Sequence, residues 1–354
     1  MNYFQRLFHK PFFIRLFNWE YWPFAAVYSP ILLFWLVLSA RARSFFFFNA
    51  SNPSIENGGM LNESKKDIHD IIPDHLYPKT IHFSIEEQPA KIRLALQSAG
   101  MNYPLFAKPD IGGRGRGVKK ITNDHELFQY VEHATMAFHI QEFVPYEKEV
   151  GVFYFKYPGR EKGEISGIVR KEFLSVTGNG TDSYFELLKR DKRGVMYVDQ
   201  ITELMGDEIF NIPEKNKNVV VSPYGNHARG SLFIDDSHLA DDRLLKTMDH
   251  IASQIPDFYF GRLDIRFKDW NSFKDGRDYK VIELNGAGAE PTHIYDPKHS
   301  IFFAWREIIR HWWIMTTISI MNRKRGVRYL SFKQGNAMLR QNNILSKKLA
   351  EIPR

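Results

Sequence analysis

The residues best suited to chemistry lie in two short stretches that have the pattern of neighbouring strands. Side chains alternate between the two faces of a strand, so the sequence GRLDIR places Arg262, Asp264 and Arg266 on one face. About twenty residues later, VIELNG places Glu283 and Asn285 together in the same way. Neighbouring strands would thus bring three oxygen donors together, which suits Mg²⁺ bound beside substrate phosphates. Solvated strand edges are the alternative, but the glycine turn after Asn285 favours a site.

A glycine-rich loop, FAKPDIGGRGRGV at residues 106–118, follows a predicted strand. Glycines allow backbone N–H groups to approach phosphates closely, and Lys108 adds a positive charge beside them. The loop lacks the terminal Gly-Lys-Ser/Thr of a P-loop. Glycine loops are common, so this one does not by itself establish a nucleotide site. A third segment, QEFVPYEKEV, carries Glu142 and Glu149 on either side of a Val-Pro bend, and alone it indicates only a strand end and a turn.

These segments belong to a region with the alternating pattern of a mixed α and β protein. Helices are predicted over residues 124–134 and 239–254, where apolar residues recur at helical spacing. Strands are predicted over residues 103–108, 117–121, 139–143, 150–157, 164–174, 259–267 and 279–285.

The order and spacing of these segments resemble the ATP-grasp superfamily over residues 90–300, roughly 60% of the chain. Short matches are similar to its glutamate ligase, cyanophycin synthetase and D-alanine–D-alanine ligase branches. The resemblance implies an α+β fold of two lobes that grip ATP between antiparallel sheets. It also implies a reaction in which a carboxylate is activated as an acyl-phosphate and then joined to an amine.

The resemblance implies that one group of residues binds ATP. Lys108 matches the lysine that contacts phosphate before the glycine loop, and Glu149 matches the acid that binds the ribose hydroxyls. The loop that closes over the phosphates matches Gly112, Gly113, Gly115 and Gly117. The hinge that reads adenine matches Gln141, Glu142, Phe143 and Val144, the last two through main-chain groups.

A second group would act on the transferred phosphoryl group. Lys171, in VRKEF, matches a second lysine near the phosphates, and Arg262 matches the arginine beside the group in transfer. The magnesium ligands, with Mn²⁺ as the alternative metal, match Asp264, Glu283 and Asn285. Arg229, in NHARG, lies in a segment that resembles the border of the acceptor site, where its fork could hold a carboxylate or acyl-phosphate. A surface ion pair is the alternative for Arg229.

Basic and aromatic residues gather at the two ends of the chain. Residues 1–48 carry five Lys/Arg against one Glu, and residues 301–354 carry eleven against two, whereas residues 49–300 sum to −6. Six of the seven tryptophans lie in these ends. Such rings beside cations are typical of a membrane interface, although single-stranded nucleic acid fits the same composition. The apolar run at residues 21–40 favours a membrane surface, and no nucleic-acid partner is expected.

Residues 21–40 carry no charge, and twenty apolar residues suffice to span a bilayer. Pro23 and Pro30 interrupt this run, so two short helices in a re-entrant or interfacial hairpin are expected rather than one straight span. Basic residues on both sides favour the cytoplasmic face for both flanks. Monotopic attachment or a single span is therefore expected, with the active site in the cytoplasm. A signal peptide and a buried core helix are the alternatives.

The predicted organisation has four parts: a membrane-associated segment (1–48), a polar connecting region (49–89), the ATP-grasp domain (90–300) and basic amphipathic helices (301–354). Residues 301–321 are expected to pack on the first apolar run, to lie in the interface, or to form an ordinary core helix, and residues 301–325 are expected at the membrane. The chain has no cysteine, which excludes disulfides and thiolate metal sites.

The expected function is an ATP- and Mg²⁺-dependent ligase that joins a carboxylate to an amine at the membrane surface. A phosphotransferase of the same fold is one alternative. A non-catalytic, membrane-associated nucleotide-binding protein is the other. The presence of Lys108, Arg262, Asp264, Glu283 and Asn285 argues against mere binding, since a sensor need not keep every phosphate and metal group.

Overall fold

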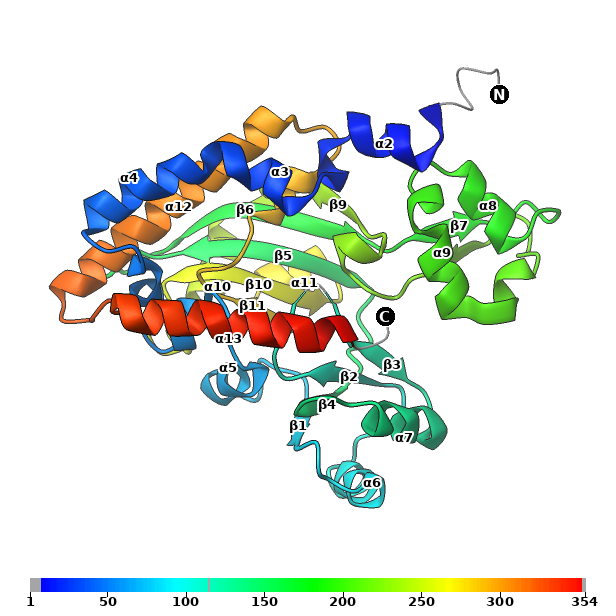
Figure 1. Ribbon diagram of the computed structural model, residues 1–354. Helices are drawn as coiled ribbons and strands as arrows, with labels where there is room; N and C mark the ends of the chain where they lie inside the picture. Colours follow the sequence, from blue (N-terminus) through cyan, green and yellow to red (C-terminus); the bar gives the residue numbers. More distant parts are fainter. Residues whose placement is uncertain (1–7, 114, 352–354) are drawn as a thin grey trace.

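The computed structural model describes residues 8–113 and 115–351, which form two large antiparallel sheets and a third of two short strands, with helices packed around them (Figure 1). Residues 1–7 of the predicted membrane-associated segment lie outside the described residues, as do residues 114 and 352–354.

The smaller sheet has the strand order β1-β4-β2-β3. Its strands are β1 (Thr80–Phe83), β2 (Leu105–Pro109), β3 (Lys119–Ile121) and β4 (Phe138–Glu142). One face packs on α6 (Pro89–Ser98) and α7 (Asp124–Glu132) through a buried apolar core that includes Ile92, Leu127 and Ile140. On the other face, α5 (Lys65–Ile71) brings His69 against His82.

The larger sheet has the order β11-β10-β5-β6-β9. Its strands are β5 (Lys148–Phe155), β6 (Glu164–Glu172), β9 (Leu232–Asp235), β10 (Phe260–Phe267) and β11 (Tyr279–Asn285). Val152, Ile168 and Leu263 bury one face against α10 (Asp242–Ser253) and α11 (Trp270–Lys274). Since side chains alternate along a strand, the opposite face is free to carry the charged residues predicted for the site.

A smaller unit lies between β6 and β9 in the sequence. It contains β7 (Ser175–Thr177), α8 (Tyr184–Arg190), α9 (Gly194–Met205) and β8 (Asn218–Val220). Its core is a separate apolar cluster that includes Leu188 and Ile201. Ser183 and Glu186 form a capping box that starts α8. Elsewhere in the chain and in this unit, short 3₁₀ helices occur at Trp19–Tyr21, Ser29–Ile31, Phe47–Ser51, Glu56–Gly59, Gly206–Phe210, His227–Arg229, Ser237–Leu239 and Thr292–Tyr295.

The N-terminal apolar run forms a nearly continuous helix and not the expected hairpin. After α2 (Pro11–Phe17), α3 (Phe24–Tyr28) and α4 (Leu32–Ala42) are joined by a single 3₁₀ turn. The reason is the position of Pro30, which falls in the first turn of that 3₁₀ helix, where no N–H is needed. By length and composition, Phe24–Ala42 is the one helix among the described residues that could cross a membrane, and 17% of it is buried.

Two long helices complete the chain. α12 (Ile301–Lys324) lies along α4 (Figure 1), where Trp35 and Trp312 meet edge to face with ring centroids 5.2 Å apart. Packing on the first apolar run was one of the arrangements expected for this segment. α13 (Phe332–Glu351) passes in front of the lower part of the larger sheet in Figure 1, above the smaller sheet, and its Leu349 lies against Gly112.

The region expected to be only a connection, residues 49–89, contributes to the smaller lobe. β1 supplies an edge strand that pairs with β4, and α5 covers one face of that sheet. A strand of four residues is too short to be recognised by alternation, so the polar, turn-rich composition of the region indicated only a linker.

Candidate active site

A row of alternating charges crosses the larger sheet on the face opposite α10. The strand register places Glu149 of β5 opposite Arg266 of β10 and opposite Lys171 of β6. Glu149 Oε2 lies 3.1 Å from Arg266 Nε, and its Oε1 lies 2.8 Å from Lys171 Nζ. Lys171 Nζ also lies 3.0 Å from Asp264 Oδ2, and Asp264 Oδ1 accepts from Arg262 Nε at 2.8 Å. The row carries three cations and two anions, an excess of positive charge that suits a phosphate.

Burial and pairing act in opposite directions on these groups. Burial would raise the pKa of Asp264, but Arg262 and Lys171 lower it to about 2. Burial would lower the pKa of Lys171 and of Arg262, yet the neighbouring carboxylates raise both. Asp264, Lys171 and Arg262 are therefore ionised at neutral pH. Gly151, opposite Asp264, leaves space for the row, since a Cβ there would lie 3.0 Å from Asp264 Oδ1.

The three predicted metal ligands share one face, where the end of β11 lies beside the first half of β10. Asp264 pairs with Glu283 in register, and Arg262 pairs with Asn285. The buried Asn285 Nδ2 has no hydrogen-bond partner among the described residues. Two carboxylates and the amide oxygen of Asn285 fit a magnesium ion, whose ligands in proteins are oxygens.

Lys108 approaches this site from the smaller sheet. Its Nζ donates to Gln141 Oε1 at 2.7 Å, and Gln141 Nε2 donates to Thr80 Oγ1 at 3.1 Å. Burial lowers the pKa of Lys108 to about 8, while Glu283 of the larger sheet acts to raise it. The ammonium of Lys108 therefore lies within the electrostatic reach of a predicted metal ligand on the other lobe.

The predicted glycine loop has the backbone that its glycines allow. Gly112, Gly115 and Gly117 adopt positive φ values of 137°, 69° and 67°, whereas Gly113 does not. The left-handed region favours glycine because other residues clash there. At the base of the loop, Lys65 Nζ donates to the carbonyl of Gly112 at 2.6 Å.

Arg229 lies against this loop. A Cβ on Gly115 would lie 3.6 Å from Arg229 Nε, and Arg229 Nη1 donates to the Val118 carbonyl at 3.2 Å. The guanidinium also stacks on Tyr224 at 4.1 Å from the ring centroid. The structure thus brings Arg229 together with the glycine loop, although 111 residues separate Arg229 from Val118.

The predicted adenine hinge lies where β4 ends. Phe143 stacks on Phe106, with ring centroids 6.1 Å apart, and the Glu142 N–H donates to the Lys79 carbonyl at 2.9 Å. The Val144 carbonyl accepts from Arg266 Nη1 at 3.3 Å. Both carboxylate oxygens of Glu149 also accept hydrogen bonds from protein side chains. A nucleotide that hydrogen-bonded to the Val144 carbonyl and to Glu149 would therefore have to displace Arg266 and Lys171.

Sequence reasoning missed several residues around the site. Alternation placed Arg266 on the same face as Arg262 and Asp264, but only the register shows that it pairs with Glu149. Lys65 comes from a segment without a motif, as does Glu63, whose pKa is raised by burial. Gly225 lies so close to Glu149 that a Cβ would come within 2.3 Å of Oε1, and no local pattern indicates this.

Comparisons with known proteins give structural neighbours only. No protein-family model and no curated protein matches the chain. A bifunctional glutathione synthetase from Pasteurella multocida is 16% identical over 67% of this chain and 34% of its own, with a TM-score of 0.36. The VanG D-Ala:D-Ser ligase from Enterococcus faecalis is 14% identical over 73% and 63%, with a TM-score of 0.40. The D-alanine–D-alanine ligase from Bacillus anthracis is 14% identical over 77% and 71%, with a TM-score of 0.43.

The chain spans about a third of the length of the first of these proteins, and all three are ATP-grasp ligases. The fold itself is assigned on the topology. Two antiparallel sheets carry the charged row, the oxygen donors and the glycine loop in the order that the resemblance predicts. The chain therefore has the α+β architecture that the resemblance to the ATP-grasp superfamily predicts, with antiparallel sheets and helices packed around them.

Proposed function

We propose that this chain is an ATP-dependent ligase that joins a carboxylate to an amine. The observation that carries the proposal is the charged row of β5, β6 and β10, in which Asp264 lies beside Glu283 and Asn285. A row with excess positive charge next to three oxygen donors suits a nucleotide phosphate bound with a divalent cation.

ATP would lie between the two sheets. Its adenine would hydrogen-bond to main-chain groups of Phe143 and Val144, in the hinge that starts at Gln141 and Glu142. Its ribose hydroxyls would hydrogen-bond to Glu149. Lys108 and the loop glycines would bind the phosphates from the smaller lobe, with Lys171 opposite them. Binding would require the Arg266 and Lys171 contacts of Glu149 to rearrange, because both Glu149 oxygens have protein partners.

Asp264, Glu283 and Asn285 would hold Mg²⁺, or Mn²⁺ in its place, and the ion would offset phosphate charge. An oxygen of the substrate carboxylate would attack the γ-phosphorus, and the bond to the ADP oxygen would break. The amine would then attack the acyl carbon, and phosphate would leave with the former carboxylate oxygen.

The protein's own cations would supply most of the remaining stabilisation. Lys108, Lys171 and Arg262 would offset the charge of the phosphoryl group in transfer, which is mainly an electrostatic task. Arg229, already against the glycine loop, would hold the carboxylate or the acyl-phosphate. Closure of the loop would exclude water, which would otherwise hydrolyse the intermediate.

We also propose that the enzyme lies on the cytoplasmic face of a membrane, attached by α2, α3 and α4 and by α12. These N-terminal helices follow one another along the top of Figure 1 and expose large apolar side chains. The most exposed of these are Phe12, Phe17, Phe24, Leu32, Leu33, Leu36 and Val37.

The contacts at the two ends of this segment favour monotopic attachment over a span. Glu20 lies 3.1 Å from Arg193 and 2.8 Å from His227, and Arg41 donates to Thr317 at 3.1 Å. A crossing helix would have to release at least one of these ends from the body.

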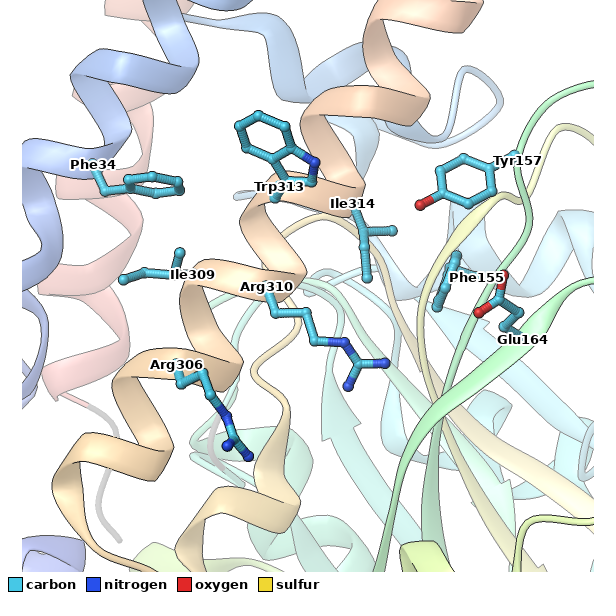
Figure 2. Close-up of a pocket in the computed structure, with 9 residues that line it drawn as sticks. All are labelled: Phe34, Phe155, Tyr157, Glu164, Arg306, Ile309, Arg310, Trp313 and Ile314. Atoms are coloured by element: carbon cyan, nitrogen blue, oxygen red, sulfur yellow. The ribbon is translucent and has the colours of Figure 1, made fainter.

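A pocket beside α12 also supports attachment of this side of the protein to a membrane. It has a volume of about 470 Å³ and is lined by apolar rings together with Arg306, Arg310 and Glu164 (Figure 2). It lies at the opposite end of β5 and β6 from Glu149 and Lys171, so it is separate from the candidate active site. Apolar walls with two arginines suit an anionic lipid headgroup.

The experiment that tests the function is magnesium-dependent ATP turnover with pooled amino acids, small acids and a membrane lipid extract. ADP and phosphate are both quantified. A ligase releases the two together, and only with the pool that holds its substrate. ADP without phosphate would indicate a phosphotransferase, and ATP binding without turnover in any pool would favour a non-catalytic nucleotide-binding protein.

A further inference from the structure

A cluster of two histidines and an aspartate lies in the smaller lobe, outside the groups used for the proposed reaction. The register places His82 of β1 opposite His139 of β4, so the two imidazoles share one face of the sheet. Asp110 follows the end of β2, the other neighbour of β4. One ligand atom from each of His82, Asp110 and His139 lies within 4.8 Å of the other two.

The histidines of this cluster have unsatisfied nitrogens. His139 is 1% exposed, and neither of its ring nitrogens has a hydrogen-bond partner among the described residues. The buried Nδ1 of His82 is likewise without a partner in that part of the chain. Leaving a buried polar group unsatisfied costs about 1–3 kcal/mol, so native proteins rarely do so without a reason. A bound cation would satisfy one nitrogen of each imidazole.

We propose that His82, His139 and Asp110 bind a divalent transition metal of the Zn²⁺ class. Two imidazoles and a carboxylate are ligands that Zn²⁺ accepts, whereas Mg²⁺ and Ca²⁺ prefer oxygen ligands alone. This site is therefore chemically distinct from the three oxygen donors Asp264, Glu283 and Asn285.

The surroundings of the cluster orient its ligands. His82 Nε2 lies 3.3 Å from His69 Nδ1, which can fix the tautomer of His82, as outer partners of metal-bound histidines do. Asp110 Oδ1 accepts from Ser64 Oγ at 3.0 Å and from the Lys66 N–H at 2.9 Å.

Two ammonium groups near the cluster point to other acceptors. Lys108 Nζ is bonded to Gln141, and Lys65 Nζ is bonded to the Gly112 carbonyl. The bound metal would join β1, β4 and the start of the glycine loop, because Asp110 lies two residues before Gly112. Its role would be to fix the base of that loop, and the proposal does not depend on the ligase assignment.

The test uses the full-length protein after removal of metals with a chelator. Zn²⁺ alone is titrated in competition with a chromophoric chelator, and Co²⁺ serves as a spectroscopic probe of coordination. One equivalent is expected to bind. His82→Gln and His139→Gln should each lose at least about 100-fold in affinity, and His69→Gln about 10–100-fold, since it removes an outer partner only. His133→Gln, an exposed histidine of the same lobe, is the matched control and should bind as the wild type does.

A second variant guards against a histidine substitution that simply fails to fold. Asp110→Asn keeps an acceptor for Ser64 and the Lys66 N–H but removes the charge, so it should keep its circular dichroism and thermal transition while losing affinity. Asp264→Asn should leave Zn²⁺ binding unchanged. The proposal is overturned if no stoichiometric binding is found, or if His82→Gln and Asp110→Asn, both folded, bind Zn²⁺ as tightly as the wild type.

Discussion

Asp264 is the residue on which the candidate site converges. It lies opposite Glu283 on β11 and accepts from both Arg262 and Lys171. With a pKa of about 2, its carboxyl is ionised throughout the physiological range. A charged oxygen donor held by two cations is preorganised for a metal ion and a phosphate, because little reorganisation is needed when they bind.

Removing either carboxylate of the proposed magnesium site should abolish most activity. Asp264→Asn and Glu283→Gln should each lower ATP turnover by at least about 100-fold, the scale for losing one preorganised stabilising group. Asp275→Asn, which alters an exposed aspartate paired with Arg243, should leave turnover unchanged. Steady-state ADP release measures all three variants. Near-normal rates in both site variants would contradict the assignment of the metal ligands.

The buried charged row should also contribute to stability. Lys171→Met leaves Glu149 and Asp264 buried with one cation fewer, which should lower the free energy of unfolding by about 3–5 kcal/mol. Lys217→Met removes the exposed pair with Glu214 and should change it by less than about 1 kcal/mol. Urea denaturation followed by circular dichroism compares the two, and equal effects would show that the row has no special role in the fold.

At the scale of elements, the strands that carry chemistry were predictable from the sequence. All seven predicted strands are present, and most of them combine an apolar run with turn residues at the ends. β1, β7, β8 and β9 were missed, since three or four residues are too few for alternation to stand out. The expected hairpin at residues 21–40 was wrong, because Pro30 lies in a first helical turn, where proline is tolerated.

The site was predictable only in part for a related reason. Alternation within β10 and β11 placed Asp264, Glu283 and Asn285 on one face, and the structure brings them together. The pairing of Glu149 with Lys171 depends on the register between β5 and β6, and that of His82 with His139 on the register between β1 and β4. No local sequence pattern determines such a register, so these pairs required the structure.

The backbone conformation of the glycine loop predicts which glycines can be replaced by alanine. Gly117→Ala should destabilise the protein by about 1–2 kcal/mol, because φ is 67° and an L-residue is strained there. Gly113→Ala should be tolerated, since its φ is not positive and a Cβ would meet nothing within 4 Å. Thermal unfolding of the two variants measures the difference. Equal stability would indicate that the loop does not hold this conformation in solution.

At the scale of the whole molecule, the aromatic and basic ends of the chain come together in space. α4 lies along α12, and Arg41 stacks on Trp313 at 4.1 Å from the ring centroid. Because α12 packs on β5 at Phe153, toward the opposite end of the strand from Glu149, a membrane could contact α4 and α12 without covering the charged row.

The proposed attachment is tested by flotation of the full-length protein with vesicles that contain anionic lipid. Leu33→Glu, at a side chain 73% exposed on α4, should lower binding by at least about tenfold. Leu94→Glu, at a side chain 61% exposed on α6, should have no effect. Equal binding by both variants would contradict attachment through α4.

The central claim, activation of a carboxylate by ATP, predicts where one oxygen atom goes. Once a substrate pool supports turnover, the carboxylate is labelled with ¹⁸O and the released phosphate is analysed by mass spectrometry. An acyl-phosphate intermediate transfers one labelled oxygen to each phosphate, because the bond between that oxygen and the acyl carbon breaks when the amine attacks. Phosphate without the label, or ADP formed without phosphate, would contradict the account.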